Sequence, residues 1–429
     1  MAQRGYQVSV YERRGDMRLS QVEQGRSINL ALSDRGLQAL RLVDIDDEIK
    51  KICIPMHGRL IHDSEGRLTM QPYSGREGQW INSVSRSDLN RILIEAADRF
   101  NKVHFFFNQK CLDIDLEYNR VKFQDLEGGD IYTQRGDVIF GADGAGSALR
   151  KRMERDAETL DFQVDQSFLA HGYKELSIPP TAEGDYRIDK NVLHIWPRGT
   201  YMLIALPNLD GSFTVTLFLP YDADPGFNQL KTDEEISAFF NNHFADVVEH
   251  MPQLVDAFKS NPTGPLGTVR CYPWQHASKS LLIGDSAHAI VPFYGQGMNC
   301  AFEDVYVLDQ LYDTYDGDWS KILTAYQAQR KPNTDAIAEL ALENYIEMRD
   351  QVADPAFALK RQLEMRLESE IENYYSKYSM VTFRADLSYT EAANRGHDQN
   401  DKLLAWCRDN LELDIGTVDL ETLMKELGI

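Results

Sequence analysis

The chain has 429 residues, 43% of them hydrophobic and 26% charged, which is ordinary for a soluble globular protein of two or three domains. Its formal net charge of −22 argues against a nucleic-acid or anionic-membrane partner, because either surface would repel the protein's average field. Five cysteines without C-x-x-C spacing, no apolar run of about 20 residues and no signal-peptide pattern predict a cytoplasmic protein with reduced thiols and no membrane span.

The N-terminal segment is typical of the end of a helix, a glycine stop at Gly5, and a strand from Gln7 to Tyr11 that ends at Glu12. In a dinucleotide-binding βαβ unit, the second strand ends in an acidic residue that binds the adenosine ribose, about 20 residues after a G-x-G-x-x-G loop. Glu12 fits that position, but no strand and glycine loop precede it in the sequence. The sequence therefore predicts a chain that opens inside such a unit, and an edge strand with a surface glutamate is the alternative.

Short elements follow up to residue 100. From Arg26, the sequence predicts a strand and then a helix with Ser33 as its N-cap. Residues 56–69 predict a hairpin that turns at residues 64–66. Ser85 is expected to cap an amphipathic helix with Arg86 on its first turn.

Two segments in the middle of the chain carry strong patterns. Residues 136–150, GDVIFGADGAGSALR, predict a buried strand, an Asp143-Gly144 turn and a helix. Residues 165–275 are rich in predicted strands, with a hairpin formed by residues 201–207 and 212–219. Alternation along a strand places three side chains of each hairpin strand on a common face, namely Met202, Ile204 and Leu206, and Thr214, Thr216 and Phe218. We expect this region to form a second, β-sheet domain.

The most informative stretch is residues 281–308, in which an apolar run ends in Gly284-Asp285 and a Gly295-Gln296-Gly297 loop leads into a helix. The loop and the helix N-terminus offer backbone N–H groups to a ligand. Asp285 follows a predicted strand, where ligands of open α/β sheets bind, and its carboxylate can accept hydrogen bonds from sugar hydroxyls. A strand, turn and helix without any ligand is the alternative. After Leu308 the sequence predicts helices to its end.

The turns at Asp143-Gly144 and Gly284-Asp285 are similar to the DG and GD motifs of FAD-dependent aromatic hydroxylases. Six further segments resemble the kynurenine 3-monooxygenase family among them, namely residues 26–36, 56–63, 193–219, 291–304, 342–348 and 377–383. The resemblance implies an α/β fold with a Rossmann-like FAD-binding domain (1–165 and 266–330), an inserted antiparallel β-sheet substrate domain (166–265) and a C-terminal helical region (331–429) that completes the substrate pocket. The short, acidic end of the chain predicts no C-terminal membrane anchor, as in bacterial members.

The resemblance also implies the substrate contacts. The clamp for the carboxylate and amino group of L-kynurenine falls on Arg59, Tyr73, Asn344 and Tyr378. A guanidinium with phenol hydroxyls suits an amino-acid carboxylate. Asn344 also interrupts an apolar helical stripe, so its amide needs a partner from the backbone or from a ligand. The other members of that stripe are Ile337, Leu340, Ala341 and Met348. The aromatic ring is expected between Leu193, Met202, Leu206, Thr216 and Phe218 above and Pro292, Phe293 and Tyr294 below.

The FAD contacts that the resemblance implies are Glu12, Arg13, Arg86, Asp143, Gly144, Gly284, Asp285, Pro292, Gly295, Gln296, Gly297, Met298 and Asn299. NADPH is expected to dock near the Asp143-Gly144 turn, because the sequence holds no second nucleotide-binding unit.

The implied reaction is the hydroxylation of L-kynurenine to 3-hydroxykynurenine by NADPH and O₂ through a flavin C4a-hydroperoxide, a step of tryptophan degradation and of NAD or quinolinate biosynthesis. The aniline nitrogen already activates the ring carbon, so we expect no general base, no histidine–acid pair that would serve as one, and no metal. Tyr294 stands where some relatives carry histidine, and we expect His288 to be structural. The enzyme would be a monomer or a homodimer. Two alternatives stay open: a related hydroxylase of a phenolic substrate, and a flavin-deficient, non-catalytic binding protein, which the missing glycine loop favours.

Overall fold

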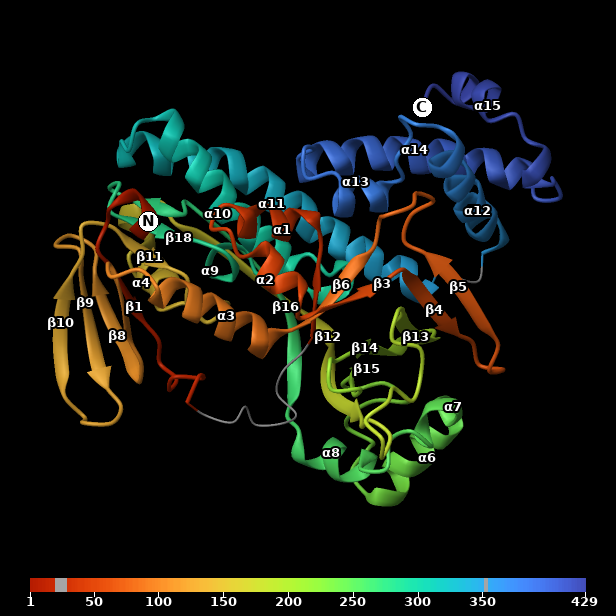
Figure 1. The fold of residues 1–429 in the computed structure, drawn as a ribbon, viewed down its shortest axis with the longest axis horizontal. Coiled ribbons are helices and arrows are strands. Elements are labelled where there is room, and N and C mark those ends of the chain that lie inside the picture. Colours follow the sequence, from red (N-terminus) through yellow and green to blue (C-terminus); the bar gives the residue numbers. More distant parts are fainter. Residues whose placement is uncertain (20–28, 351–353) are drawn as a thin grey trace.

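The computed structural model describes residues 1–19, 29–350 and 354–429, and the side chains of residues 348–350 lie outside this description. Its helices and strands form a mixed α/β fold (Figure 1). The strands are β1 (Val8–Tyr11), β2 (Asn29–Leu32), β3 (Cys53–Met56), β4 (Gly58–His62), β5 (Leu68–Pro72), β6 (Ile81–Ser85), β7 (Val103–Phe106), β8 (Gln109–Asp115), β9 (Arg120–Asp125), β10 (Ile131–Arg135), β11 (Ile139–Gly141), β12 (Gln163–Ile178), β13 (Leu193–Arg198), β14 (Tyr201–Pro207), β15 (Phe213–Pro220), β16 (Thr263–Tyr272), β17 (Gln275–His276) and β18 (Ser280–Leu282). The helices are α1 (Asp34–Arg41), α2 (Asp46–Lys50), α3 (Arg86–Asp98), α4 (Ala148–Arg155), α5 (Ala157–Leu160), α6 (Asp233–His243), α7 (Ala245–Val248), α8 (Leu254–Ser260), α9 (Asp285–His288), α10 (Gly297–Thr314), α11 (Trp319–Asp350), α12 (Pro355–Glu370), α13 (Lys377–Phe383), α14 (Tyr389–Asp409) and α15 (Leu420–Leu427).

A seven-stranded sheet of order β16-β12-β15-β14-β13-β4-β5 forms the largest layer. All its neighbours pair antiparallel except β13 and β4, which run parallel and place Leu193 beside Arg59. The predicted hairpin is confirmed, because β14 and β15 pair Met202 with Phe218, and Ile204 with Thr216. One face of this sheet packs on α6, α7 and α8 through a core of aliphatic and phenylalanine side chains.

Two shorter parallel pairs lie outside this sheet, and the pair β11–β18 leads into the turns at Asp143-Gly144 and Gly284-Asp285. β1 pairs with β7, and β11 pairs with β18, and no hydrogen-bonded pairing joins these two pieces among the residues that the structure describes. The three-stranded sheet β2-β6-β3 and the meander β10-β9-β8 complete the strands. The meander lies at one end of the molecule and the C-terminal helices α12 and α15 at the other (Figure 1).

The helical prediction beyond Leu308 is confirmed by α10 to α15. Helix α11 carries Pro332 in its interior and runs past the second face of the large sheet, where its apolar side meets α13 and α14. Within the described parts of the chain, no helix combines the length and apolarity that crossing a membrane requires.

Most of the predicted local elements are present. Gly5 has φ 95° after a single 3₁₀ turn, and the Ser85 hydroxyl accepts from the Asp88 N–H as the N-cap of α3. Ser33 does occupy the N-cap position of α1, but its side chain caps nothing; its backbone N–H donates to Asn299 Oδ1 at 2.9 Å instead. The predicted strand from Arg26 begins at Asn29, since residues 26–28 lie outside the described residues.

The expected fold class, α/β with an antiparallel sheet and C-terminal helices, is confirmed. The large sheet takes β4 and β5 from before residue 165, so it draws on both sides of the predicted boundary between the FAD-binding and substrate domains. The division into three domains therefore stays a prediction.

Candidate active site

The second face of the large sheet packs against apolar side chains where the sequence predicts the slot for the substrate ring. Cross-strand pairing brings Met202 beside Phe218, and both side chains are buried against Phe293 and Tyr294. A neighbouring cluster holds Leu206 and Tyr73, with Leu193, Ile204 and Tyr378 packed at its border. Ile204 and Tyr378 contact both clusters, so most of the predicted ring-binding residues belong to one continuous group of packed side chains.

Three tyrosines and one arginine lie together at the end of this slot. The rings of Tyr73 and Tyr378 stack with centroids 5.6 Å apart, and Tyr294 stacks on the other face of Tyr378 at 5.4 Å. The Arg59 guanidinium carbon lies 4.7 Å from the Tyr378 centroid and 5.7 Å from that of Tyr73. The structure thus brings together three of the four predicted clamp residues from β4, the segment after β5, and α13.

Arg59 is a cation close to the hydroxyl groups of Tyr73 and Tyr378. Burial works against its charge, but the phenol groups of Tyr378 and Tyr73 and the Glu347 carboxylate outweigh burial and raise the pKa of Arg59. No ion pair joins Arg59 to a carboxylate among the residues that the structure describes. Such a guanidinium, flanked by hydroxyls, is suited to bind a ligand carboxylate in a bidentate way.

Asn344 connects the long helix to the opposite wall of the slot. Its Nδ2 donates to the backbone carbonyl of Phe293 at 2.7 Å, and the Asn344 side chain is buried. The Phe293 ring stacks on Tyr345 with centroids 4.3 Å apart and meets Phe218 at 5.1 Å. The backbone partner expected for the Asn344 amide is therefore present, and it belongs to the predicted floor of the pocket. The side chain of Met348, predicted on the same stripe, lies outside the described residues.

The glycine loop before α10 is built for a close ligand. Gly295 adopts φ 70°, a conformation that glycine reaches without strain. Among the residues that the structure describes, no side chain caps the N-terminus of α10, which leaves its first N–H groups available to a ligand. Asn299 fixes the loop from inside, since its Nδ2 donates to the carbonyls of Ala31 at 2.8 Å and Gly295 at 3.0 Å.

The two Asp-Gly turns are tied to each other by Ser286. Its hydroxyl accepts from the Gly144 N–H at 3.0 Å and donates to Asp143 Oδ1 at 3.2 Å, while Asp143 Oδ2 accepts from the Ala148 N–H at 2.6 Å. Asp285 is exposed, and no hydrogen bond to its carboxylate is recorded within the described chain. A Cβ built on Gly144 would meet no atom within 4 Å, so open space lies beside the turn. An exposed carboxylate, open glycines and a free helix N-terminus fit the hydroxyls, phosphates and carbonyls of a dinucleotide such as FAD.

The remaining predicted cofactor residues lie farther out. Glu12 follows β1 and binds Arg14, whose Nε lies 3.0 Å from Glu12 Oε1, while Arg13 is exposed. Arg86 is exposed at the start of α3, near enough to the Glu175 carboxylate to oppose the burial that raises the pKa of Glu175 to about 7. The predicted roles of Glu12, Arg13 and Arg86 in binding FAD stay predictions.

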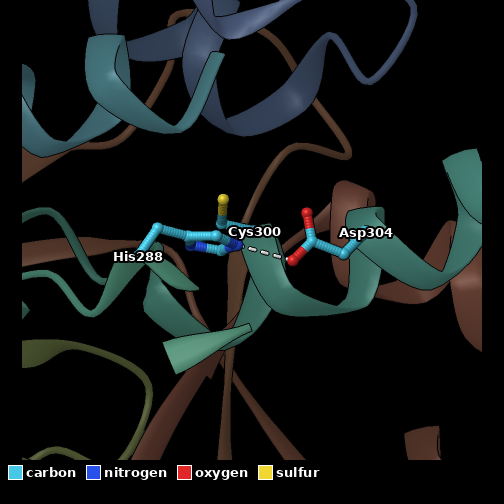
Figure 2. Close-up of side chains that lie close together, drawn as sticks. All are labelled: His288, Cys300 and Asp304. Carbon is cyan, nitrogen blue, oxygen red and sulfur yellow. Dashed lines mark hydrogen bonds and ion pairs between the residues drawn. The ribbon is translucent and has the colours of Figure 1, made fainter. Parts of the chain in front are cut away.

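Sequence reasoning missed a buried charge network under the GD turn. His288 Nε2 lies 2.6 Å from Asp304 Oδ2, which also accepts from the Gly284 N–H at 3.0 Å (Figure 2). The sequence expectation concerns a histidine–acid pair that acts as a general base, and that expectation stays a prediction. Burial alone lowers the pKa of His288, but the Asp304 carboxylate raises it well above 6.5. The expected structural role of His288 is consistent with its 4% exposure.

Cys300 lies beside this pair, and the three side chains have the residue types of a metal site (Figure 2). The atoms that could bind a metal already take part in hydrogen bonds within the protein, however. Arg330 Nε donates to Asp304 Oδ1 at 2.7 Å, and Arg330 Nη2 lies 3.3 Å from Cys300 Sγ. A guanidinium so close to the sulfur opposes a second cation, so we assign the cluster to protein hydrogen bonds. Arg330 and the imidazolium of His288 offset the burial of Asp304 and lower its pKa to about 2.

Two histidines, His62 and His194, lie next to each other on the face of β4 and β13 that points away from the predicted pocket. His194 Nε2 lies 2.7 Å from the Asp189 carbonyl, and its Nδ1 lies 2.9 Å from His62 Nε2. His62 Nδ1 in turn lies 3.0 Å from Asp246 Oδ2. A carbonyl only accepts, so His194 Nε2 donates to it. The period-2 alternation of β4 and β13, which places Arg59 and Leu193 on the pocket face, was the signal for this cluster.

Known proteins resemble the chain over nearly its whole length. A family model described as FAD binding domain matches residues 1–341. A kynurenine 3-monooxygenase of Myxococcus xanthus is 46% identical over 384 residues, which are 89% of this chain and 82% of the relative. A kynurenine 3-monooxygenase of Flavobacterium johnsoniae is 44% identical over 425 residues, 99% of this chain and 94% of the relative. The solved tetrameric form of 2-methyl-3-hydroxypyridine-5-carboxylic acid oxygenase is similar in fold, with a TM-score of 0.65 and 19% identity over 84% of this chain and 90% of that chain.

Proposed function

The chain belongs to the kynurenine 3-monooxygenases, a family of FAD-dependent aromatic hydroxylases, and from this we propose that it converts L-kynurenine to 3-hydroxykynurenine with NADPH and O₂. The observation that carries the proposal is the position of Arg59 beside the stacked rings of Tyr73 and Tyr378, next to a cluster of apolar side chains. That arrangement suits a ligand with an aromatic ring at one end and an amino-acid carboxylate at the other.

Arg59 binds the kynurenine carboxylate in this proposal. Burial raises the pKa of Tyr73, so Tyr73 keeps its hydroxyl proton and can donate to the carboxylate. Tyr378 stacks on Tyr73 beside the guanidinium and offers a second hydroxyl. Asn344 holds the pocket floor through the Phe293 carbonyl, and in this proposal it contacts the substrate's amino group.

The apolar slot holds the ring and excludes water from it. Met202, Leu206 and Phe218 are each at most 6% exposed, and Phe293 is 8% exposed opposite them. Thr216 and Leu193 lie on the same face of the sheet. Two packed walls limit the ring to one plane, which is the positioning that attack on a single ring carbon requires.

The cofactor contacts follow from the open surfaces of the two turns. In this proposal Asp285 binds the ribityl hydroxyls of FAD, and the amides from Gly295 to Asn299 face the isoalloxazine ring with Pro292; the exposure of Asp285 and the uncapped start of α10 support it. Gly284, Asp143 and Gly144 shape the turns between which the dinucleotide would lie. When bound, FAD takes hydride from NADPH and activates O₂ for the hydroxylation.

No side chain of the slot needs to act as a base. The aniline nitrogen of kynurenine activates the ring carbon beside it, whereas a phenol would first have to lose a proton. Tyr294 is the titratable group next to the ring position, and burial raises its pKa well above 10. Tyr294 therefore keeps its proton and serves to pack against Tyr378.

Replacing Arg59 tests the function. We expect purified, FAD-loaded protein to oxidise NADPH in response to kynurenine, and Arg59→Ala to raise the KM for kynurenine by about a hundredfold, which is close to 3 kcal/mol. The same variant should leave unchanged the response to 2-aminoacetophenone, which keeps the ring but lacks the amino acid. Arg67→Ala, which removes an exposed arginine of the same hairpin, is the matched control.

Two outcomes would contradict the proposal. If Arg59→Ala leaves the KM unchanged and a phenol stimulates NADPH oxidation, the enzyme is a hydroxylase of phenolic substrates. If the protein binds no FAD when the cofactor is added in excess, the non-catalytic alternative holds. A homodimer and a cytoplasmic location complete the proposal, and light scattering of the purified protein and fractionation of the native cells test them.

A further inference from the structure

Arg35 is a buried cation that none of the proposed substrate or cofactor contacts uses. It lies on α1, its side chain is fully buried, and it contacts segments more than 260 residues away in the sequence. Its Nη1 donates to Glu303 Oε1 of α10 at 2.5 Å. Burying an arginine costs free energy unless its donors are satisfied, so the contacts of this side chain define what it does.

Most of the Arg35 donors bind the end of one short helix. Nε donates to the Val381 carbonyl at 2.7 Å, and Nη2 donates to the carbonyls of Arg384 at 3.1 Å and Leu387 at 2.7 Å. Val381 lies in the last turn of α13, where carbonyls lack helical partners and the helix dipole is negative. Arg35 therefore closes the C-terminal end of α13 with its guanidinium fork.

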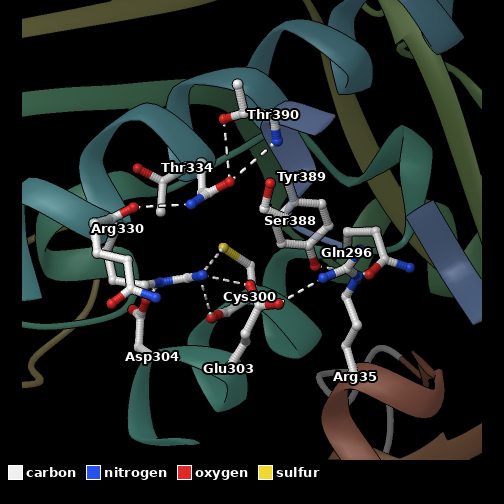
Figure 3. Close-up of polar contacts among 12 residues, drawn as sticks. Arg35, Gln296, Cys300, Glu303, Asp304, Arg330, Thr334, Ser388, Tyr389 and Thr390 are labelled. Atoms are coloured by element: carbon white, nitrogen blue, oxygen red, sulfur yellow. Dashed lines mark hydrogen bonds and ion pairs between the residues drawn. The ribbon is translucent and has the colours of Figure 1, made fainter. Parts of the chain in front are cut away.

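The same side chain is linked to the glycine loop that faces the cofactor. The Arg35 guanidinium carbon lies 4.1 Å from the centroid of the Tyr389 ring, and the Tyr389 hydroxyl donates to Gln296 Oε1 at 3.0 Å (Figure 3). Glu303 binds Arg35 through one oxygen and Arg330 Nη1 through the other, at 2.5 Å each. The Arg35 guanidinium thus joins α13 to α10 at two points. It contacts Glu303 of α10 directly, and it reaches Gln296, the N-cap of α10, through Tyr389.

Helix α13 begins one residue before Tyr378, which stacks between Tyr73 and Tyr294 beside Arg59. Because α13 is a rigid unit of two turns, fixing its C-terminal carbonyls fixes the position of Tyr378 at its other end. We propose that Arg35 is a positioning residue that sets the substrate clamp against the cofactor loop by holding α13 to α10. Its effect on kynurenine rests on the proposed function, whereas its hold on α13 does not.

The test compares Arg35→Met and Arg35→Lys with wild-type protein, each loaded with FAD. Hydrogen exchange of the amides from 377 to 387 reports the hold on α13, and we expect it to accelerate about tenfold or more in Arg35→Met. The KM for kynurenine should rise about tenfold, with more peroxide formed per NADPH oxidised. Lysine keeps the charge but has no planar fork, so Arg35→Lys should not restore either property.

Lys174→Met is the matched control, because Lys174 is another buried cation that donates to carbonyls at the end of a short helix. Its Nζ donates to Phe258 at 2.9 Å and Asn261 at 2.7 Å, at the end of α8 on the far face of the sheet. We expect this variant to loosen α8 while exchange in α13 and the KM for kynurenine stay as in wild type.

Three results would overturn the proposal: unchanged exchange of residues 377–387 in both Arg35 variants, faster exchange without any change in KM, or full recovery of both properties in Arg35→Lys. If Arg35→Met does not fold, Arg35→Lys alone decides. If wild-type protein shows no response to kynurenine, the proposed function fails, and the exchange data still decide whether Arg35 holds α13.

Discussion

The side-chain amide of Asn344 donates to the backbone carbonyl of Phe293 at 2.7 Å, and this bond joins the long helix α11 to the floor of the apolar slot. Phe293 lies in the turn Pro292–Tyr294, directly before the glycine loop that faces the cofactor site. One hydrogen bond therefore ties α11, which carries Asn344, to the Pro292–Tyr294 turn.

Removing this amide should weaken substrate binding. Asn344→Leu keeps the volume but leaves the buried Phe293 carbonyl without its donor, which costs about 1–3 kcal/mol. We expect the KM for kynurenine to rise about tenfold or more, with bound FAD unchanged. Asn241→Ala, which removes a local amide–carbonyl bond on α6, is the control and should change neither quantity. An unchanged KM in Asn344→Leu would separate Asn344 from the clamp.

The exposed carboxylate of Asp285 should matter for FAD and not for folding. It lies at the start of α9, directly after Gly284, and it has no recorded hydrogen-bond partner within the described chain. Asp285→Ala should therefore change the free energy of unfolding of the FAD-free protein by about 0.5 kcal/mol or less. FAD affinity, measured by flavin fluorescence, should fall about tenfold or more because hydrogen bonds to a charged group contribute about 1.5–3 kcal/mol.

Asp256→Ala removes one exposed acidic charge from α8 and controls for the change in net charge. If both variants bind FAD as wild type does, Asp285 does not contact the cofactor. Asp143 makes a useful contrast, since its carboxylate holds the Ala148 N–H and the Ser286 hydroxyl. Asp143→Ala should lower stability as well as FAD affinity.

Local patterns in the sequence predicted the parts of the fold that depend on neighbours in the chain. Period-2 alternation predicted which residues of β14 and β15 share a face, because side chains of a strand alternate whatever the partner. The Asp-Gly turns and the cap at Ser85 follow from backbone preferences of single residues. These features need no knowledge of the tertiary structure.

Long-range pairing could not be predicted in the same way. The parallel pairing of β4 with β13 joins residues 59 and 193, and no periodicity in either strand indicates it. Ser33 has the residue type of an N-cap, yet tertiary contact with Asn299 replaced the cap. The buried ions Arg35, Glu303 and Arg330 look like surface charges in the sequence, since only their mutual contacts make burial affordable.

His194 should make the protein less stable in mild acid. Burial lowers the pKa of His194 to about 4 in the folded state. In the unfolded chain His194 binds a proton near pH 6.5, whereas in the folded protein it binds one only near pH 4. The contribution of neutral His194 to the free energy of unfolding is therefore complete above pH 6.5 and falls as the pH drops from 6.5 to about 4. The loss can reach about 3 kcal/mol, and urea unfolding from pH 7 to pH 4.5 measures it.

His194→Gln should flatten this acid slope, because glutamine can donate to the Asp189 carbonyl without titrating. His104→Gln removes an exposed histidine of β7 and should leave the slope as it is. An equal slope in wild type and His194→Gln would show that other groups cause the loss of stability.

His288 should have the opposite dependence on pH. The Asp304 carboxylate raises the pKa of His288 well above 6.5 despite burial, so the folded protein holds a proton that the unfolded chain releases near neutral pH. The stabilisation is therefore complete below about pH 6.5 and is lost as the pH rises through the raised value. His288→Gln keeps a donor to Asp304 but removes the charge, which should lower the free energy of unfolding at pH 6 by about 2–3 kcal/mol. His397→Gln, in an exposed pair with Glu343, should cost about 1 kcal/mol or less. The difference in the free energy of unfolding between wild type and His288→Gln, measured with urea, should decrease from pH 6 to pH 10. A difference that stays constant over this range would mean that the His288 charge does not stabilise the folded protein.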